Sequence, residues 1–258
     1  MNIFLTGGSG FVGKNIISEL KSKYNIHAPS SSELNLVNSD ELEAYINQYN
    51  FKFIINCAVR GGRRTNIDTE KDFYNNIKIL DNLLKYTNDN RKLITFSSGA
   101  EIYNLESYYG FSKKISTSLI KDNKNIKNLR IYNVFGESGM KDSFVYTAVE
   151  KCLMNEDIVV WDDKYFDIFY IKDLIKIIDN LMIEDSFGYQ EIDCVYEQKY
   201  KLSEIANLIK KLSNSKSNII IKNDTNSIYT GIFTRRIEEP TPLNISLNKM
   251  ISHIRESQ

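Results

Sequence analysis

The residue pair with the clearest chemical use is Tyr109 and Lys113, which are four positions apart. In a helix this spacing puts both side chains on one face, one turn apart. A nearby ammonium group stabilises a phenolate and lowers the pKa of tyrosine from about 10 toward neutrality. The phenol could then exchange a proton with the oxygen of an alcohol or a ketone. The pair therefore predicts acid–base chemistry at such an oxygen.

A second tyrosine, Tyr74, has a lysine at the same spacing, Lys78, so the spacing alone does not identify the site. Only Tyr109 comes shortly after a predicted strand that ends in two serines, Ser97 and Ser98. A serine hydroxyl at a strand end can orient a substrate carbonyl beside the proton donor. We therefore predict that the Tyr109 pair carries the chemistry.

A glycine-rich segment, TGGSGFVG at residues 6–13, directly follows a predicted strand and opens a predicted helix. Its first glycine permits a tight turn, its second lets the backbone approach a pyrophosphate, and its third allows close helix–strand packing. The helix N-terminus adds N–H groups for the phosphates. Glycines also occur in ordinary turns, but the position between strand and helix favours a dinucleotide site. The predicted contacts are Gly7, Ser9, Gly10, Phe11, Val12 and Gly13.

The end of the second predicted strand bears on the choice of dinucleotide. NAD enzymes usually hold an acidic residue there for the ribose hydroxyls. This chain has Ser30 and Ser31 at that place and no acid before Glu33. Because hydroxyls could accommodate a 2′-phosphate, we predict NADP(H) rather than NAD(H). The serines could instead form a turn that caps a helix, and no basic residue accompanies them.

Short apolar runs alternate with longer amphipathic stretches, which is typical of βαβ units and a parallel sheet covered by helices. Strands are predicted at 2–6, 25–28, 53–57, 93–97 and 129–132, and helices from the glycine loop to about 23 and at 39–49, 70–86 and 107–121. The pattern loosens after about residue 175, with a helix at 202–212, a strand at 218–222 and a turn at 239–242 before a last helix. We predict an α/β fold with a doubly wound parallel sheet of the Rossmann type over residues 1–160. A small C-terminal α/β substrate lobe over residues 161–258 is expected to interleave with this core.

The composition limits the function classes. At 258 residues and 42% hydrophobic content, the chain can bury a substantial core. Its 33 Lys and Arg balance 33 Asp and Glu without a basic run, so no nucleic-acid partner is expected. Cys57, Cys152 and Cys194 lack any CxxC spacing, which predicts packing roles in a reducing compartment and no metal site. No apolar run has the length of a signal peptide or a membrane span, so we expect a cytoplasmic protein.

Taken in order, these features resemble the extended short-chain dehydrogenase/reductase family, whose members act largely on nucleotide sugars. Four segments add to the glycine loop, the serine and the Tyr109 pair. Residues 56–58 are similar to the family's N-x-A, 76–84 to N-V-x-x-x-x-N-L-L, 130–136 to R-x-x-N-V-Y-G and 166–173 to R-D-F-x-Y-V-x-D. Residues 32–36 and 58–62 are similar to segments of GDP-fucose synthases and related 4-keto-sugar reductases. The likeness covers about the first 175 residues.

The resemblance implies roles for individual residues. Tyr109 would exchange a proton with the sugar oxygen, Lys113 would bind the nicotinamide ribose and lower the tyrosine pKa, and Ser98 would hold the carbonyl. A homodimer through paired helices is also implied. The other implied contacts are Cys57 and Ala58 for the dinucleotide and Asn133 for the substrate.

The family pattern S-x-x-V-Y leaves the position of the serine open. Counting back from Tyr103 places Gly99 at the serine position, whereas counting from Ile102 places Ser98 there. We predict Ser98, because a glycine cannot bind the carbonyl.

Two departures from the family favour ketoreduction. Family dehydratases resemble T-D-E near the serine, whereas here Glu101 is shifted by one position. GDP-fucose synthases that also epimerise their substrate use a cysteine and a histidine. This chain has Ala100 at the first place and no histidine within residues 137–141 around the second.

A nucleotide diphosphate needs cations, and Phe166 stands where the family has the arginine of R-D-F. Arginines elsewhere could compensate, since their fork-shaped donors suit phosphates, although each could equally be a solvated surface charge. The candidates are Arg60, Arg63 and Arg64, and, in the C-terminal lobe, Arg235 and Arg236.

We therefore predict an NADP(H)-dependent reductase of a nucleotide-activated 4-keto sugar that serves cell-surface polysaccharide biosynthesis. One alternative is an NDP-sugar 4-epimerase with tightly held NAD, which needs the same Ser98, Tyr109 and Lys113. Another is a non-catalytic dinucleotide-binding regulatory protein. The glycine at position 99 favours that alternative, and the intact Tyr109/Lys113 pair argues against it.

Overall fold

The computed structural model describes residues 1–63, 66–184, 190–234 and 239–257, which form two compact units. The first unit comprises Met1–Arg130 and Ile175–Ile192, and the second Ile131–Leu174 and Asp193–Gln258. The chain enters the second unit at residue 131 and returns to the first for residues 175–192, so the two units are interleaved along the sequence.

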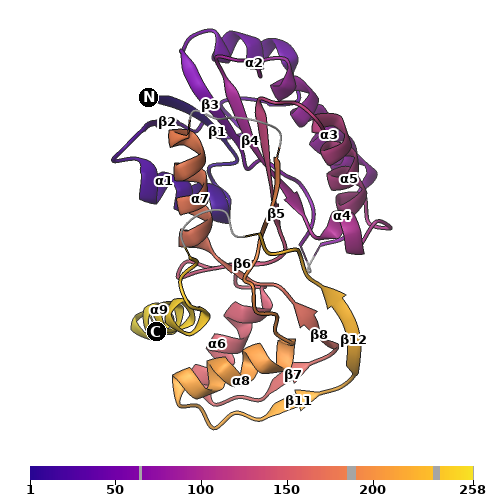
Figure 1. The fold of residues 1–258 in the computed structure, drawn as a ribbon, viewed down its shortest axis with the longest axis vertical. Coiled ribbons are helices and arrows are strands. Elements are labelled where there is room, and N and C mark those ends of the chain that lie inside the picture. Colours follow the sequence, from indigo (N-terminus) through magenta and orange to yellow (C-terminus); the bar gives the residue numbers. More distant parts are fainter. Residues whose placement is uncertain (64–65, 185–189, 235–238, 258) are drawn as a thin grey trace. The chain divides into compact units, whose positions relative to one another are not determined.

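A six-stranded sheet forms the centre of the first unit, in the order β10-β5-β4-β3-β1-β2 (Figure 1). Its strands are β1 (Asn2–Thr6), β2 (Asn25–His27), β3 (Phe51–Asn56), β4 (Lys92–Ser98), β5 (Ile126–Ile131) and β10 (Gln190–Cys194). Strand β1 pairs in parallel with both β2 and β3, and β3 pairs in parallel with β4. The strand order reverses at β1, and a doubly wound sheet opens its ligand crevice at the carboxyl ends beside such a reversal. The predicted doubly wound α/β fold is confirmed.

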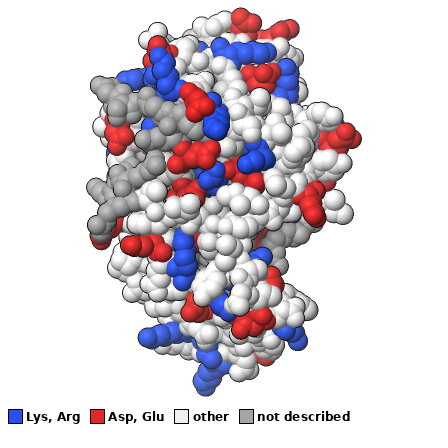
Figure 2. All heavy atoms as spheres, turned by 45° about the vertical axis from the view of Figure 1, so that its right-hand side comes forward, with Lys and Arg blue, Asp and Glu red and all other residues white. Residues whose placement is uncertain are grey.

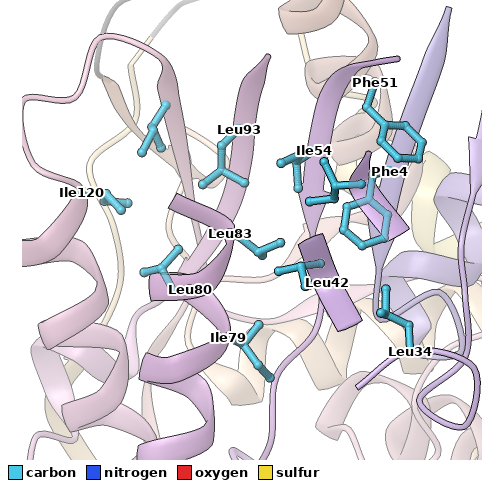
Figure 3. Packing of buried hydrophobic residues seen from close by; sticks show 12 residues of the cluster. Phe4, Leu34, Leu42, Phe51, Ile54, Ile79, Leu80, Leu83, Leu93 and Ile120 are labelled. Atoms are coloured by element: carbon cyan, nitrogen blue, oxygen red, sulfur yellow. The ribbon is translucent and has the colours of Figure 1, made fainter. Parts of the chain in front are cut away.

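Helices cover both faces of this sheet. In Figure 1, α1 and α7 lie on one side and α3 and α5 on the other. The helices are α1 (Phe11–Leu20), α2 (Ser39–Ile46), α3 (Glu70–Leu84), α4 (Ala100–Tyr103), α5 (Tyr108–Ile120) and α7 (Ile171–Ile183). Apolar side chains of α2 and α3 fill the space against the strands, as Figure 3 shows for Leu42, Leu83, Phe4 and Ile54, all of which are fully buried.

Polar side chains fix where these helices begin. Asn38 accepts hydrogen bonds from the N–H groups of Asp40 and Glu41 at the start of α2. Thr69 and Asp72 form a reciprocal capping box at the start of α3. Such caps satisfy N–H groups that the helix itself leaves unpaired, so the helix starts are set locally.

Among its described residues, the second unit contains three pairs of short parallel strands and three complete helices. Of these elements, the sequence predicted only α8, β11 and α9. The pairs are β6 (Val134–Phe135) with β9 (Phe169–Tyr170), β7 (Ile158–Val160) with β11 (Ile219–Ile221), and β8 (Asp163–Phe166) with β12 (Asp224–Tyr229). The helices are α6 (Phe144–Met154), α8 (Leu202–Ser213) and α9 (Leu243–Glu256).

On the face that Figure 2 shows, Lys and Arg are interspersed with Asp and Glu between areas of uncharged residues. Among the described residues, no helix has both the length and the apolar character that crossing a membrane requires.

Candidate active site

The glycine loop follows β1 and packs against the end of β3. Gly7 has a positive φ of 68°, and a Cβ there would lie 2.6 Å from backbone atoms of Cys57 and Ala58. Only glycine fits this turn. The glycine loop and residues 57–58 were both predicted to contact the dinucleotide. They thus lie next to each other, at the carboxyl ends of β1 and β3.

The start of α1 lies equally close to the loop. A Cβ on Gly13 would lie 2.3 Å from the carbonyl oxygen of Gly7, so the helix packs on the turn at a distance that only glycine permits. Gly10 caps α1 without a side-chain hydrogen bond, and the first turn of the helix carries no acidic residue. The first turn therefore presents N–H groups to an anion without a competing carboxylate, as a dinucleotide pyrophosphate requires. Ser9, Phe11 and Val12 lie in the same turn and are at least partly exposed.

A chain of hydrogen bonds holds the strand ends beneath the loop. The hydroxyl of Thr6 donates to Asn56 (2.7 Å) and accepts from the N–H of Ala58 (3.2 Å). Asn56 donates onward to Thr95 of β4 (3.4 Å). The ends of β1, β3 and β4 are therefore tied together at the edge where the predicted site lies.

The serine segment that follows β2 is exposed, and its Ser30 binds the neighbouring Glu33. The carboxylate of Glu33 accepts hydrogen bonds from the N–H (2.7 Å) and the hydroxyl (2.8 Å) of Ser30. These bonds hold the pKa of Glu33 below its usual range. Ser31 is exposed beside them. A negative charge thus lies among the hydroxyls that were predicted to receive a phosphate.

Tyr109 and Lys113 lie on the first turns of α5, as predicted. The amine of Lys113 donates to the carbonyl oxygen of Phe96 in β4 (2.6 Å) and lies 5.7 Å from the centre of the Tyr109 ring. Burial lowers the pKa of Lys113 to about 8, although the charge of Glu101 and the thiol of Cys57 act in the opposite direction. The ammonium is therefore placed to stabilise a phenolate on Tyr109.

The two serines at the end of β4 have different partners. Ser98 is buried, and its hydroxyl accepts a hydrogen bond from the N–H of Ala100 (3.2 Å). Ser97 donates to the carboxylate of Glu101. The hydroxyl of Ser97 is thus engaged by Glu101 within the core. Ser98 is the last residue of β4 and directly precedes the turn into α4.

A buried ion network that the sequence reasoning did not predict lies behind these serines. Glu101 is 2% exposed and accepts hydrogen bonds from Arg130 (2.5 Å) and from Thr117 (2.5 Å). Arg130 also binds Glu191 of β10 (2.6 Å). The four residues are far apart in the sequence, so no local pattern could have indicated them.

The loop after β3 packs on the ring of Tyr109. Gly61 and Gly62 both have positive φ angles, 83° and 73°, and the N–H of Gly62 donates to Asp68 (2.8 Å). A Cβ on Gly62 would lie 2.8 to 2.9 Å from three atoms of the Tyr109 ring. The backbone of this loop therefore touches the phenol face, a contact that the two adjacent glycines could have indicated.

Asn76 of α3 holds the same loop. Its side chain accepts from the N–H of Arg60 (2.8 Å) and donates to the carbonyl oxygen of Arg60 (3.0 Å). It also donates to Ser112 (3.2 Å), the residue before Lys113. The side chains of Arg60 and Arg63 extend from this loop and are exposed, and Arg64 lies outside the described residues.

The remaining predicted substrate residues belong to the second unit. The Oδ1 atom of Asn133 is buried and accepts no hydrogen bond from the described residues, as expected of a position that a ligand or water satisfies. Phe166 stacks on Tyr229 with ring centres 5.3 Å apart. Arg235 and Arg236 lie outside the described residues.

Glu137 lies in the segment 137–141, where the family resemblance places the histidine of epimerising members. The hydroxyl of Tyr170 donates to its carboxylate (2.7 Å), and Lys172 lies 3.2 Å away. Burial raises the pKa of Glu137, but these contacts outweigh burial and hold the pKa below its usual range. Glu137 is therefore ionised at neutral pH and is a poor proton donor.

Comparison with known proteins gives a family and a partial relative. Residues 3–192 match the model of the NAD dependent epimerase/dehydratase family. A GDP-L-colitose synthase from Yersinia pseudotuberculosis is 40% identical over 103 residues, which make up 38% of this chain and 33% of that protein. The match thus spans about a third of the relative's length.

Solved structures share the whole fold at low identity. A GDP-mannoheptose C4 reductase from Campylobacter jejuni with NADP bound has a TM-score of 0.78 and 16% identity over 98% of both chains. A UDP-glucose 4-epimerase from Thermotoga maritima with UDP-glucose has a TM-score of 0.78 and 18% identity, covering 100% of this chain and 99% of that one. At these identities the likeness shows the fold.

Proposed function

Since the chain belongs to the NAD dependent epimerase/dehydratase family, we propose that it is an NADP(H)-dependent reductase of a nucleotide-activated 4-keto sugar. The observation that carries this proposal is the position of Lys113. Its amine bonds to the strand that ends at Ser98 and lies 5.7 Å from the ring centre of Tyr109. An ammonium, a phenol and a serine hydroxyl are thus gathered at the same sheet edge as the glycine loop.

In the proposed reaction, Ser98 donates a hydrogen bond to the carbonyl oxygen at C4 of the sugar. Tyr109 gives its phenolic proton to that oxygen as the carbonyl becomes an alcohol. Lys113 stabilises the phenolate that remains, because its positive charge lies beside the ring. When bound, the dinucleotide supplies the hydride that reduces C4.

Two observations support reduction over dehydration or epimerisation. The carboxylate of Glu101 is engaged by Arg130 and Thr117 in the core, so it does not offer an acid to a leaving hydroxyl. Glu137 is held ionised by Tyr170 and Lys172. Within the described residues, neither position provides a second proton donor for the sugar.

For the substrate, we propose a nucleoside diphosphate sugar whose phosphates contact Arg60 and Arg63. Both side chains are exposed on the loop that packs on Tyr109. The partial relative is a GDP-L-colitose synthase, which supports a GDP-linked sugar as the first candidate.

For the cofactor, we propose NADP(H), held by the glycine loop and residues 57–58. The NADP in the Campylobacter jejuni reductase supports this choice. One observation favours NAD(H) instead, because the carboxylate of Glu33 lies at the Ser30 hydroxyl and would repel a 2′-phosphate. The ratio of kcat/KM for NADPH and NADH separates the two. A Glu33→Gln variant should raise the ratio toward NADPH if this carboxylate opposes the phosphate.

We further propose a homodimer through the outer faces of α3 and α5. Tyr74 is 60% exposed, Phe111 46% and Leu119 51%, and Phe73 stacks on Phe111 at 5.4 Å. Contiguous exposed apolar side chains on paired helices are typical of an interface. Light scattering should give twice the chain mass, and a Phe111→Lys/Leu119→Lys variant should give a monomer.

The test of the proposed reaction is NADPH consumption with a panel of GDP-, CDP-, dTDP- and UDP-4-keto-6-deoxy sugars, followed by nicotinamide absorbance. We expect turnover with one nucleotide class and a loss of about 10²-fold or more in kcat for Tyr109→Phe. Binding of NADPH without turnover of any sugar would favour the regulatory alternative. Interconversion of sugar epimers without net NADPH consumption would favour the epimerase.

A further inference from the structure

Glu101 is a buried carboxylate that the proposed reaction does not use. It is 2% exposed and lies three residues after Ser98, on the short helix α4. Burying a charge is costly unless close partners compensate it. Its partners therefore indicate what the carboxylate does.

Three elements of the first unit meet at this carboxylate. One oxygen accepts from Arg130 of β5 (2.5 Å), and the other accepts from Thr117 of α5 (2.5 Å) and from Ser97 of β4. The hydroxyl oxygens of Thr117 and Ser97 also lie 3.2 Å apart. The carboxylate thus links β4, α5 and β5 at one point.

These partners are neighbours of the residues in the proposed reaction. Ser97 directly precedes Ser98, and Thr117 follows Lys113 by one helical turn on the same face. A shift of the carboxylate would therefore move the serine and the lysine relative to each other. Misplacement by even about 1 Å can cost about 10²-fold in rate.

The network also places a negative charge near Lys113. Arg130 binds two carboxylates, Glu101 and Glu191, so the three side chains together carry one net negative charge. The groups that face Lys113 are Glu101 from α4, the Cys57 thiol after β3 and the Tyr109 phenol of its own helix. Of these three groups, Glu101 is the carboxylate. Burial lowers the pKa of Lys113, whereas the charge of Glu101 raises it.

We propose that Glu101 is a positioning residue for the reaction, which holds the Ser98 turn and the Lys113 helix together and supplies the negative charge that faces the Lys113 ammonium. This inference rests on the proposed reductase function and adds to it a residue that positions the serine turn and the lysine helix and favours the charged form of the lysine.

The test compares Glu101→Gln with Glu191→Gln. Each variant removes a carboxylate that binds Arg130, and the Glu101 carboxylate also accepts hydrogen bonds from Ser97 and Thr117. For Glu101→Gln we expect kcat to fall about 10-fold or more, with little change in the sugar KM. We also expect the alkaline limb of the kcat profile to move to lower pH by about half a unit or more. Glu191→Gln should leave that limb in place.

Thr117→Val separates position from charge and covers the case in which Glu101→Gln does not fold. It removes the hydrogen bond that Thr117 donates to Glu101 and its contact with the Ser97 hydroxyl while keeping the carboxylate. We expect a lower kcat, with the alkaline limb of the kcat profile at the same pH as in the wild type. Thermal unfolding of each variant shows whether the fold is retained.

The proposal would be overturned if the alkaline limb of the kcat profile shifted equally in Glu101→Gln and Glu191→Gln. It would also be overturned if Glu101→Gln and Thr117→Val both kept the wild-type kcat and pH dependence. The pH dependence of NADPH affinity provides a readout that needs no turnover, because Lys113 is expected to contact the nicotinamide ribose. If the wild type reduces no sugar, the proposed function fails. The Glu101 proposal is then decided by whether Glu101→Gln alone moves the affinity profile to lower pH.

Discussion

The phenol of Tyr109 is held from two sides. The amine of Lys113 lies 5.7 Å from the ring centre, and the backbone of Gly62 lies so close that a Cβ there would approach three ring atoms to 2.8 to 2.9 Å. The lysine sets the charge near the ring, and the glycine loop restricts where the ring can lie. Both features bear directly on proton transfer.

The glycine loop can be tested by adding one methyl group. Gly62→Ala should lower kcat about 10-fold or more, because its Cβ collides with the Tyr109 ring. Gly61→Ala is the control for backbone strain, since its φ is similarly positive and its Cβ would lie 3.6 Å from the nearest Tyr109 atom, at ordinary contact distance. Its Cβ would lie 2.6 Å from the Asp68 carboxylate, so this variant also disturbs the acceptor of the Gly62 N–H. Steady-state kinetics with thermal unfolding measure both. Equal losses of kcat would show that the conformation of the loop and its Asp68 contact matter, and not the contact with the Tyr109 ring.

The protonation of Lys113 predicts a pH dependence. Burial lowers its pKa to about 8, so below that pH it is an ammonium that stabilises the phenolate, and above it the charge is lost. We expect kcat to fall as the pH rises through about 8. Lys113→Met removes the charge at every pH, so its low remaining activity should show no fall between pH 8 and about pH 10, where a phenol begins to ionise. A wild-type profile that is flat to that pH would contradict this assignment.

At the scale of elements, local patterns indicated the site and long-range contacts completed it. The glycine loop, the strand ending at Ser98 and the helix with Tyr109 were predicted because turn chemistry and helical spacing are local properties. The Glu101–Arg130–Glu191 network was not, because its members come from α4, β5 and β10, and only the strand order brings them together. In the second unit most short strands escaped prediction, since they span only two to six residues.

The start of α5 offers a test at this scale. Ser107 accepts a hydrogen bond from the N–H of Gly110 (2.9 Å), so it caps the turn that carries Tyr109. Ser107→Ala should lower the free energy of unfolding by about 1 kcal/mol and should also reduce kcat. Asn38→Ala removes the cap of α2 and should cost a similar free energy while leaving kcat unchanged. Urea unfolding and kinetics of the two variants check this, and unchanged kcat in Ser107→Ala would refute a role for the cap in catalysis.

At the scale of the molecule, the chain leaves the first unit at residue 131 and returns for residues 175–192. The returning segment is anchored by Asp179 of α7, which accepts from Lys23 (2.6 Å) and from Tyr24 (2.6 Å). It also supplies β10, the strand that follows β5 in the sheet order. A boundary drawn along the sequence therefore cannot separate the two units.

This interleaving predicts how fragments behave. A chain ending at residue 160 lacks α7 and β10, so β5 would be left as an exposed edge and the α1 side of the sheet would lose the cover that α7 provides. We expect it to aggregate or to show no cooperative thermal unfolding by circular dichroism. A chain ending at residue 194 retains both α7 and β10 and should bind NADPH more tightly than the shorter one. Cooperative unfolding of the 1–160 fragment at the full-length Tm would contradict this view of the fold.

The most direct test of the central claim follows a hydrogen atom. NADPH carrying deuterium at its transferring position is incubated with the 4-keto sugar that the panel identifies, and the product is analysed by NMR and mass spectrometry. The proposed reductase predicts one deuterium at C4 of the sugar for each NADPH oxidised, and loss of this product in Tyr109→Phe. Product without deuterium at C4, or conversion of the sugar without NADPH oxidation, would contradict it.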